Sequence, residues 1–103
     1  MAEVATGNRT LQANIPHPTC DVITFTDQCS TNVKIGGEGV VRQGDLVAPH
    51  TIRVGTACIV HSAPLVSFSS TVKINGKGVG RKNDVYSCGC RILTGNSKVK
   101  VGG

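Results

Sequence analysis

Residues 33–45 read VKIGGEGVVRQGD, and residues 72–84 repeat the pattern as VKINGKGVGRKND. Valine, lysine, isoleucine, glycine, arginine and aspartate recur at matching positions in the two stretches. A third copy begins as VKVGG at residues 99–103 and is cut off there by the end of the sequence. A short polar segment precedes each copy, at residues 30–32, 69–71 and 96–98. Chance explains three copies poorly, so we interpret the chain as repeats of one small structural unit.

Each copy has the pattern of a half-buried strand that ends in a tight turn. In the first copy Val33 and Ile35 alternate with Lys34, and the other two copies alternate in the same way. Such alternation places the apolar side chains on one face of a strand. The Gly-Gly pair at 36–37 and the Asn-Gly pair at 75–76 favour type I′ turns, because these residues reach positive φ at low cost. The repeats therefore predict short β-hairpins related by pseudo-threefold symmetry.

The composition agrees with one small, mainly β domain. The 103 residues include 13 Gly and 4 Pro but no Trp, one Tyr and two Phe, so a core of ordinary size and aromatic content is not available. No segment has helical periodicity. We expect one domain at residues 15–103, and a polar lead-in at residues 1–14 that is ordered only if a neighbour holds it. A domain this small often needs a crosslink.

Charge and targeting signals narrow the function classes. The formal net charge of +5 is compatible with a polyanionic partner, but the basic residues are spread along the chain and aromatic residues for base stacking are scarce. We therefore expect no nucleic-acid partner. No apolar stretch approaches the roughly 20 residues that cross a bilayer, and the N-terminus lacks the pattern of a signal peptide. The chain is expected to be made in the cytoplasm and to stay there unless a dedicated machine exports it.

Metal-binding residue types recur in register with the repeats. His61 and Cys88 each lie eleven positions before the first valine of the copy that follows. In a threefold arrangement such equivalent positions converge on the axis, where their side chains can share one ion. The first copy departs from this spacing, since His17 precedes its valine by sixteen positions and Cys20 by thirteen. His50 lies in an insertion that lengthens the second repeat and is our candidate for the fourth ligand.

Three imidazoles and one thiolate suit Zn²⁺, and iron accepts the same residue types. Other cysteines compete for the thiolate role, because three short motifs each hold two donors close in sequence: His17-x-x-Cys20, Cys58-x-x-His61 and Cys88-x-Cys90. Five cysteines cannot all pair, whereas one metal thiolate and four others fit the count. Those four could pair in three ways or stay reduced. A cytoplasmic origin favours thiols, whereas a particle that leaves the cell could oxidise them later, so the sequence leaves the pairing open.

The repeated strand, the glycine turn and the Val-x-Arg-x-x-Asp element, with His or Cys ahead of the copies, resemble the PAAR-repeat proteins. These proteins cap the spikes of type VI secretion systems and of contractile phage tails. The resemblance covers about residues 15–103 and is clearest at residues 58–84 and 88–103. The namesake Pro-Ala-Ala-Arg tetrapeptide is degenerate here, reading GVVR at residues 39–42 and GVGR at residues 78–81. The arginine and the aspartate that follows it are kept.

The resemblance implies a small cone of threefold-related β-hairpins with a metal near its apex. Family members bind zinc with three histidines and one cysteine, which implies the ligands His17, His50, His61 and Cys88. The broad base is expected to sit on a trimeric β-helical spike, one tip per trimer, and the point to pass transiently through a target-cell membrane. The expected role is structural, without enzyme activity, in a phage tail or a secretion system. Because the chain stops in its third repeat, we expect a bare cap without an effector domain.

Two other functions remain open from the residues alone. A free-standing zinc module that binds nucleic acid or another partner is compatible with the positive charge. A small metal-dependent enzyme needs a general base, and no carboxylate is placed beside the predicted ligands. Asp45 and Asp84 occupy equivalent turn positions, where a structural role is sufficient.

Overall fold

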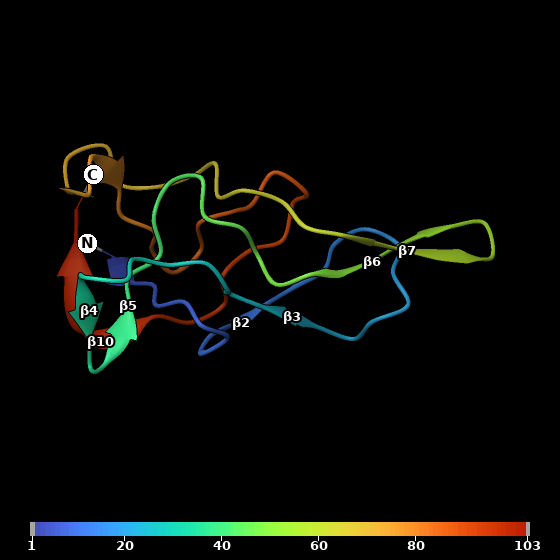
Figure 1. Ribbon diagram of the computed structural model, residues 1–103, viewed down its shortest axis with the longest axis horizontal. Coiled ribbons are helices and arrows are strands. Elements are labelled where there is room, and N and C mark those ends of the chain that lie inside the picture. The colour runs from blue at the N-terminus through green and yellow to red at the C-terminus, as the bar shows by residue number, and fades with distance from the viewer. Residues whose placement is uncertain (1, 103) are drawn as a thin grey trace.

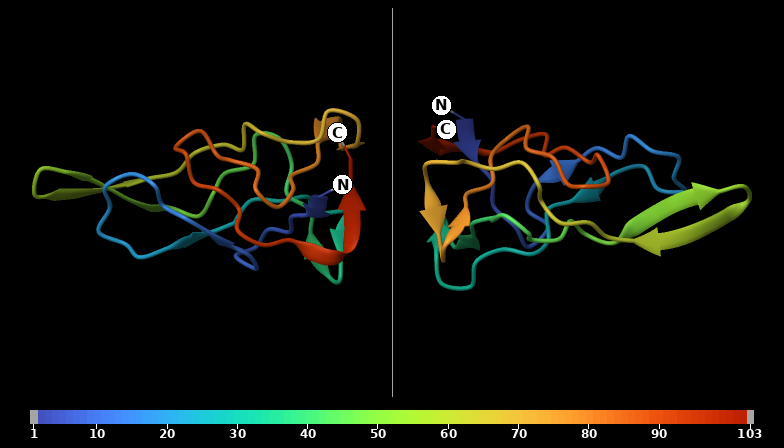
Figure 2. Two further views of the ribbon diagram at one scale, coloured as in Figure 1. Left: turned by 180° about the vertical axis from the view of Figure 1, so that it is seen from behind. Right: turned by 90° about the horizontal axis from the view of Figure 1, so that it is seen from above.

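The computed structural model describes residues 2–102 as an elongated body with principal extents of 42 × 24 × 22 Å. The body is broad at the end that holds both termini and narrows to a single hairpin at the other (Figures 1 and 2). Ten short strands and no helix occur in this part of the chain. Nothing in residues 2–102 therefore forms a helix that could cross a membrane. The predicted mainly β, conical fold class is confirmed.

The ten strands form five antiparallel pairs, each a separate two-stranded sheet. Three pairs are ordinary hairpins, joined by turns of two residues: β4 (Lys34–Ile35) with β5 (Glu38–Gly39), β6 (His50–Val54) with β7 (Ala57–His61), and β8 (Lys73–Ile74) with β9 (Lys77–Gly78). The other two pairs join more distant segments: β2 (Gln12–Ala13) with β3 (Thr24–Phe25), and β1 (Ala2–Val4) with β10 (Asn96–Val101).

The turns of the first two repeats have the predicted conformation. Gly36 and Gly37 have φ values of 60° and 84°, and Asn75 and Gly76 have values of 52° and 75°. Positive φ at both central residues is the mark of a type I′ turn, which matches the twist of the strands on either side. The hairpins at residues 33–40 and 72–79 are therefore confirmed.

The third hairpin is assembled from opposite ends of the sequence. Val101 pairs with Ala2 and Lys100 with Glu3, just as Ile35 pairs with Glu38 in the first repeat. The third copy is thus not cut off, because residues 2–4 supply its second strand. Residues 2–14 are part of the folded body, with Val4, Ala5 and Ala13 buried; β10 holds residues 2–4, and backbone hydrogen bonds to other segments of the same chain hold the rest. An unpaired β10 would leave a row of free backbone groups at its edge.

A closed ring of backbone hydrogen bonds joins the three repeats. The amide of Ala5 donates to the carbonyl of Gly80 (2.9 Å), Gly80 donates to Val41 (2.8 Å), and Val41 donates to Ala5 (3.0 Å). Space inside the ring is tight, since a Cβ at Gly80 would lie 3.1 Å from the Val41 carbonyl oxygen and 2.9 Å from a methyl group of Leu65. The glycine at position 80 of the degenerate tetrapeptide thus allows the three chain segments to approach one another closely.

Nine aliphatic side chains line a hollow of about 150 Å³ at the broad end. Each repeat contributes three equivalent residues to this base socket: Val33, Ile35 and Val40; Val72, Ile74 and Val79; Val99, Val101 and Val4. A second cluster, which includes Leu65, Tyr86 and Ile92, fills the middle of the body. The core is therefore two small layers stacked along the long axis.

The Val-x-Arg-x-x-Asp element locks the turn that follows each of the first two hairpins. The Asp45 carboxylate accepts hydrogen bonds from the backbone amide (2.8 Å), Nε (3.0 Å) and Nη2 (3.1 Å) of Arg42. Asp84 accepts the same three bonds from Arg81 at 2.7, 3.0 and 3.0 Å. Both aspartates are buried, so these fully used carboxylates hold the turns in place.

The β6–β7 hairpin extends beyond the rest of the body at the narrow end (Figure 1). We call its residues 51–60 the finger. His50 and His61 form the first cross-strand pair at its root, and Val54 pairs with Ala57 at its tip, across a turn that contains Gly55. The insertion seen in the second repeat forms this projection.

Candidate metal centre

The three histidines of the chain meet at the root of the finger. His50 and His61 face each other across β6 and β7, a cross-strand arrangement that keeps two side chains close. His17 comes from the loop between β2 and β3. The Nε2 atoms lie 2.9 Å apart for His50 and His61, 3.1 Å for His17 and His61, and 3.2 Å for His17 and His50. The predicted histidine ligands thus converge on one point, which lies at the root of the finger and not at its tip.

Backbone carbonyls orient two of these rings. The Nδ1 atom of His50 lies 2.9 Å from the carbonyl oxygen of Ala48, and that of His17 lies 3.0 Å from the carbonyl oxygen of Pro18. A carbonyl only accepts, so each Nδ1 carries the proton and each Nε2 presents a lone pair in the neutral ring. Two such lone pairs at 3.2 Å repel each other unless a cation lies between them. This is the arrangement in which metal-bound histidines are usually held.

Two sulfur atoms lie beside the imidazoles. Cys88 Sγ is 4.0 Å from His50 Nε2, and Cys90 Sγ is 3.5 Å from the same nitrogen. The two sulfurs are 3.1 Å apart. The donor atoms of His17, His50, His61 and Cys88 all lie within 4.8 Å of one another, so this group could hold a metal ion.

The donor distances fit a small tetrahedral site. Zinc bonds nitrogen at about 2.0–2.1 Å and sulfur at about 2.3 Å, which separates two nitrogen ligands by about 3.3 Å and nitrogen from sulfur by about 3.5 Å. The observed Nε2 separations of 2.9–3.2 Å lie slightly below the first value. Only a small outward movement of the rings is needed to admit the ion.

Burial shapes the protonation of these donors. Burial lowers the pKa of His61, and positive charge on His50 or His17 would lower it further, so the neutral, metal-binding form of this ring is favoured. Burial raises the pKa of Cys90 to about 12, with a further contribution from its hydrogen bond to Cys88. A bound cation acts in the opposite direction, because coordination removes the proton of a thiol.

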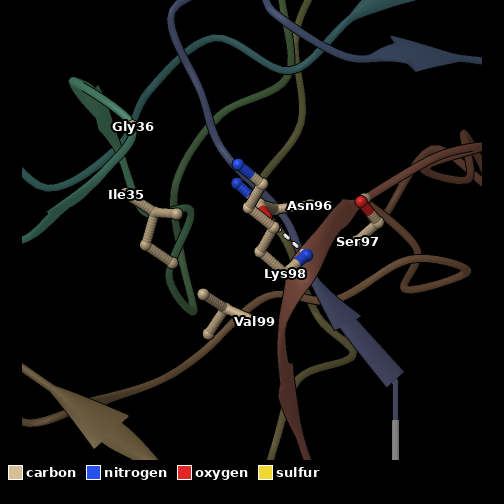
Figure 3. A pocket seen from close by; sticks show the side chains of 7 residues that line it. Ile35, Gly36, Asn96, Ser97, Lys98 and Val99 are labelled. Carbon is tan, nitrogen blue, oxygen red and sulfur yellow. Dashed lines mark hydrogen bonds between the residues drawn. The ribbon is translucent and has the colours of Figure 1, made fainter.

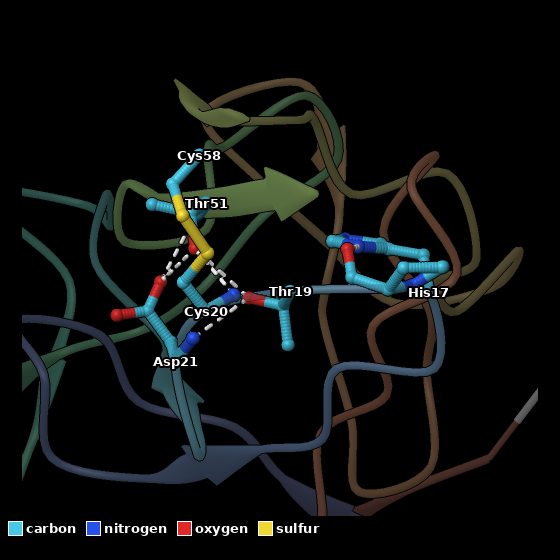
Figure 4. The surroundings of a disulfide bond; sticks show 7 residues. His17, Thr19, Cys20, Asp21, Thr51 and Cys58 are labelled. Carbon is cyan, nitrogen blue, oxygen red and sulfur yellow. Dashed lines mark hydrogen bonds between the residues drawn. A yellow bond between two sulfur atoms is a disulfide. The ribbon is translucent and has the colours of Figure 1, made fainter. Parts of the chain in front are cut away.

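A disulfide between Cys20 and Cys58 crosslinks the finger to the loop that carries His17 (Figure 4). The sequence left the cysteine pairing open, and the fold decides it by bringing these two Cα atoms to 6.1 Å, within the range of a disulfide. The bridge withdraws both cysteines from the set of rival metal donors. The Asp21 carboxylate also accepts hydrogen bonds from the backbone amide and hydroxyl of Thr51, each at 2.7 Å.

The comparison with known families agrees with this geometry. A model of the PAAR motif family matches residues 12–94. The chain belongs to the PAAR motif family. A search of the curated proteins finds no match.

Membership of the PAAR family supports a spike-tip role in contractile injection systems, and the cluster fits metal binding. The PAAR family is structural rather than enzymatic. Sequence reasoning placed Cys90 among the rival donors and did not foresee the finger. The signal for Cys90 was its position two residues after Cys88.

Proposed function

We propose that this protein is a structural tip that caps the trimeric β-helical spike of a contractile injection machine. It would lead the spike through a target membrane, with a bound metal stiffening its narrow end. The observation that carries the proposal is the contrast within one body. A threefold apolar base lies at one end, and a tapered, crosslinked projection with a metal-capable cluster lies at the other.

The base suits a trimeric partner. One chain offers three nearly equivalent surfaces, so each can meet the same surface of one of three spike subunits. We propose that the base socket receives apolar side chains from the spike axis, because six of its nine aliphatic residues are only half-buried and would otherwise face water. Lys34, Lys73 and Lys100 occupy equivalent exposed positions on the other face of the socket strands. They would pair with acidic groups at the rim of the spike.

One hollow on the side of the base breaks the threefold symmetry. It has a volume of about 490 Å³ and lies between the turn of the first hairpin and the start of β10 (Figure 3). At the matching turn position of the second repeat, the side chain of Asn75 occupies the equivalent space. It donates a hydrogen bond to Asn32 and accepts one from Arg42. Gly36 has no side chain to do the same. We propose that this hollow distinguishes one of the three spike subunits from the others.

The finger is the leading element in this proposal. Val54, Ile59 and Val60 are 57%, 51% and 67% exposed, so the surface that would enter a membrane first is largely aliphatic. The metal at the root and the disulfide along the side would keep the hairpin from bending away from the axis. Zinc is the ion we propose, since tetrahedral nitrogen and sulfur sites are its usual structural form, and iron is the alternative.

The test is copurification with a trimeric β-helical spike protein of the same injection system. We expect one tip per spike trimer by native mass spectrometry. Ile74→Asp, in the base socket, should abolish the complex while the metal content stays unchanged. Val66→Asp, at a position 52% exposed and outside the socket, is the matched control and should bind like the wild type. A spike that binds the Ile74 variant normally, or binds no tip at all, would contradict the proposal.

A further inference from the structure

Cys90 is fully buried, yet its sulfur lies against the proposed metal ligands. Its Sγ is 3.5 Å from His50 Nε2, closer than the 4.0 Å of Cys88, and 3.1 Å from Cys88 Sγ. Simple packing does not require a second thiol here, because an apolar side chain would fill the same space. Four donors already make a complete tetrahedral site, and the Cys90 sulfur lies against two of them, His50 and Cys88.

The distance from Cys90 to His50 matches that of two ligands on one ion. Nitrogen and sulfur bound to one tetrahedral zinc are about 3.5 Å apart, the separation observed for this pair. Cys88 is the more exposed of the two cysteines, with intermediate burial. The Cys90 sulfur is therefore placed to bind an ion held by His50 in place of the Cys88 sulfur.

The loop that carries the two cysteines turns both sulfurs to the same side. The amide of Tyr86 donates to the Cys90 carbonyl, and the amide of Gly89 donates to the Tyr86 carbonyl, both at 2.8 Å. Gly89 has a φ of 93°, which is strained for other residues, and a Cβ there would lie 3.1 Å from the ring of Pro16. The tight loop thus fixes the second thiol beside the first.

We propose that Cys90 is a reserve ligand of the apical metal site, able to supply the coordinating thiolate when Cys88 does not. While Cys88 binds the ion, the Cys90 thiol donates its proton to the Cys88 sulfur in a hydrogen bond. When Cys88 is lost, Cys90 releases that proton to solvent and binds the ion through its own sulfur. This inference rests on the metal centre of the proposed function, and the experiment below separates the two.

The experiment loads the full-length protein, with its Cys20–Cys58 disulfide intact, with Co²⁺ and records the sulfur-to-cobalt charge-transfer band. We expect wild type, Cys88→Ser and Cys90→Ser each to bind one Co²⁺ and to show the band. Cys88→Ser should weaken binding by no more than about tenfold, the lower end of the effect expected for a change outside the direct ligands. Cys88→Ser/Cys90→Ser should lose the band and bind at least about a hundredfold more weakly.

A Cys88→Ser protein that binds cobalt without the charge-transfer band, or not at all, would overturn the reserve role and leave the metal centre standing. Wild-type protein that binds no cobalt would overturn both. Cys88→Ala removes the serine oxygen as a substitute donor, so it should also keep the band. Circular dichroism of each variant, compared with Cys29→Ser as a cysteine control away from the site, identifies loss of fold.

Discussion

The two ends of this molecule are held together by different means. At the base, three equivalent strands pack nine aliphatic side chains against one another, and a ring of backbone hydrogen bonds joins the repeats. At the finger, the side chains of Val54, Ile59 and Val60 are more than half exposed. What holds the finger to the body is a disulfide, a few polar contacts to the loop at residues 17–21 and the histidine cluster.

The difference follows from the taper. A narrow cross-section buries little apolar area, so the hydrophobic effect that stabilises the base is weak at the finger. Crosslinks act without a core, because they restrict the unfolded chain or bind only the folded one. Symmetry and apolar packing are therefore found where the body is wide, and specific chemistry where it is thin. Each of the following experiments tests whether that division is real.

Removal of the metal should have the largest effect. A structural zinc site contributes on the order of 10 kcal/mol to folding, so chelation or His61→Ala should lower the free energy of unfolding by several kcal/mol. Hydrogen exchange should first accelerate in the finger and in the loop that carries His17, while residues 72–79 of the base stay protected. Equal loss of protection at both ends would show that the division is false.

Loss of the disulfide should come next. The bridge spans 38 residues, and the chain-entropy model gives about 3–4 kcal/mol for a loop of this length. Cys20→Ser/Cys58→Ser should lower the urea midpoint accordingly, and reduction of the wild type should give the same result. Reducing agent should have no further effect on the double variant. An unchanged urea midpoint in the double variant would show that the disulfide does not stabilise the narrow end of the molecule.

Substitutions in the base should be equivalent between repeats. Asp45→Ala and Asp84→Ala each remove a buried partner of an arginine, and each should cost about 3 kcal/mol. Urea unfolding of the two variants compares the loss in the free energy of unfolding between the first and second repeats. A difference of more than about 1 kcal/mol would show that the repeats resemble each other in shape but not in stability.

The smallest effect concerns Tyr86, in the layer between the two ends. Its hydroxyl is buried and has no hydrogen-bond partner in residues 2–102, so Tyr86→Phe should be neutral or stabilise by up to about 1 kcal/mol. Burial raises the pKa of Tyr86 well above its ordinary value of 10.0. The unfolded chain therefore loses this proton first, and wild-type stability should fall as the pH rises above about 10.

The phenylalanine variant has no phenolic proton, so it should lack this part of the alkaline loss. Urea midpoints of both proteins at pH 7 and at pH 11 give the comparison. An identical decline in the two proteins would place the alkaline sensitivity elsewhere.

Much of the base could be predicted from the sequence because its signals are local. Alternation around Lys34 and Lys73 fixed the strands, and the Gly and Asn pairs fixed the turns. The second strand of the third hairpin was missed, because residues 2–4 contain no copy of the repeat motif beyond a single valine. Their pairing with β10 depends on the closure of the whole body, which no local pattern encodes.

Repeat spacing predicted part of the candidate site. The spacing pointed to His61 and Cys88. His17 and His50 were candidates from their places in the first repeat and in the insertion, and the family resemblance selected them. The structure brings all four together. The disulfide and the position of Cys90 could not be found in this way, since both depend on distances between loops. Cys20 and Cys58 meet only because the finger passes beside the loop at residues 17–21.

The pairing of β1 with β10 also sets an order of events during folding. The finger joins residues that are close in the sequence, so it can form in about 1–10 μs once the chain is free. The third base hairpin must bring together segments separated by almost the whole chain, and the entropy of closing that loop is lost before any contact repays it. The point of the molecule should therefore take shape early, and the platform beneath it should close last.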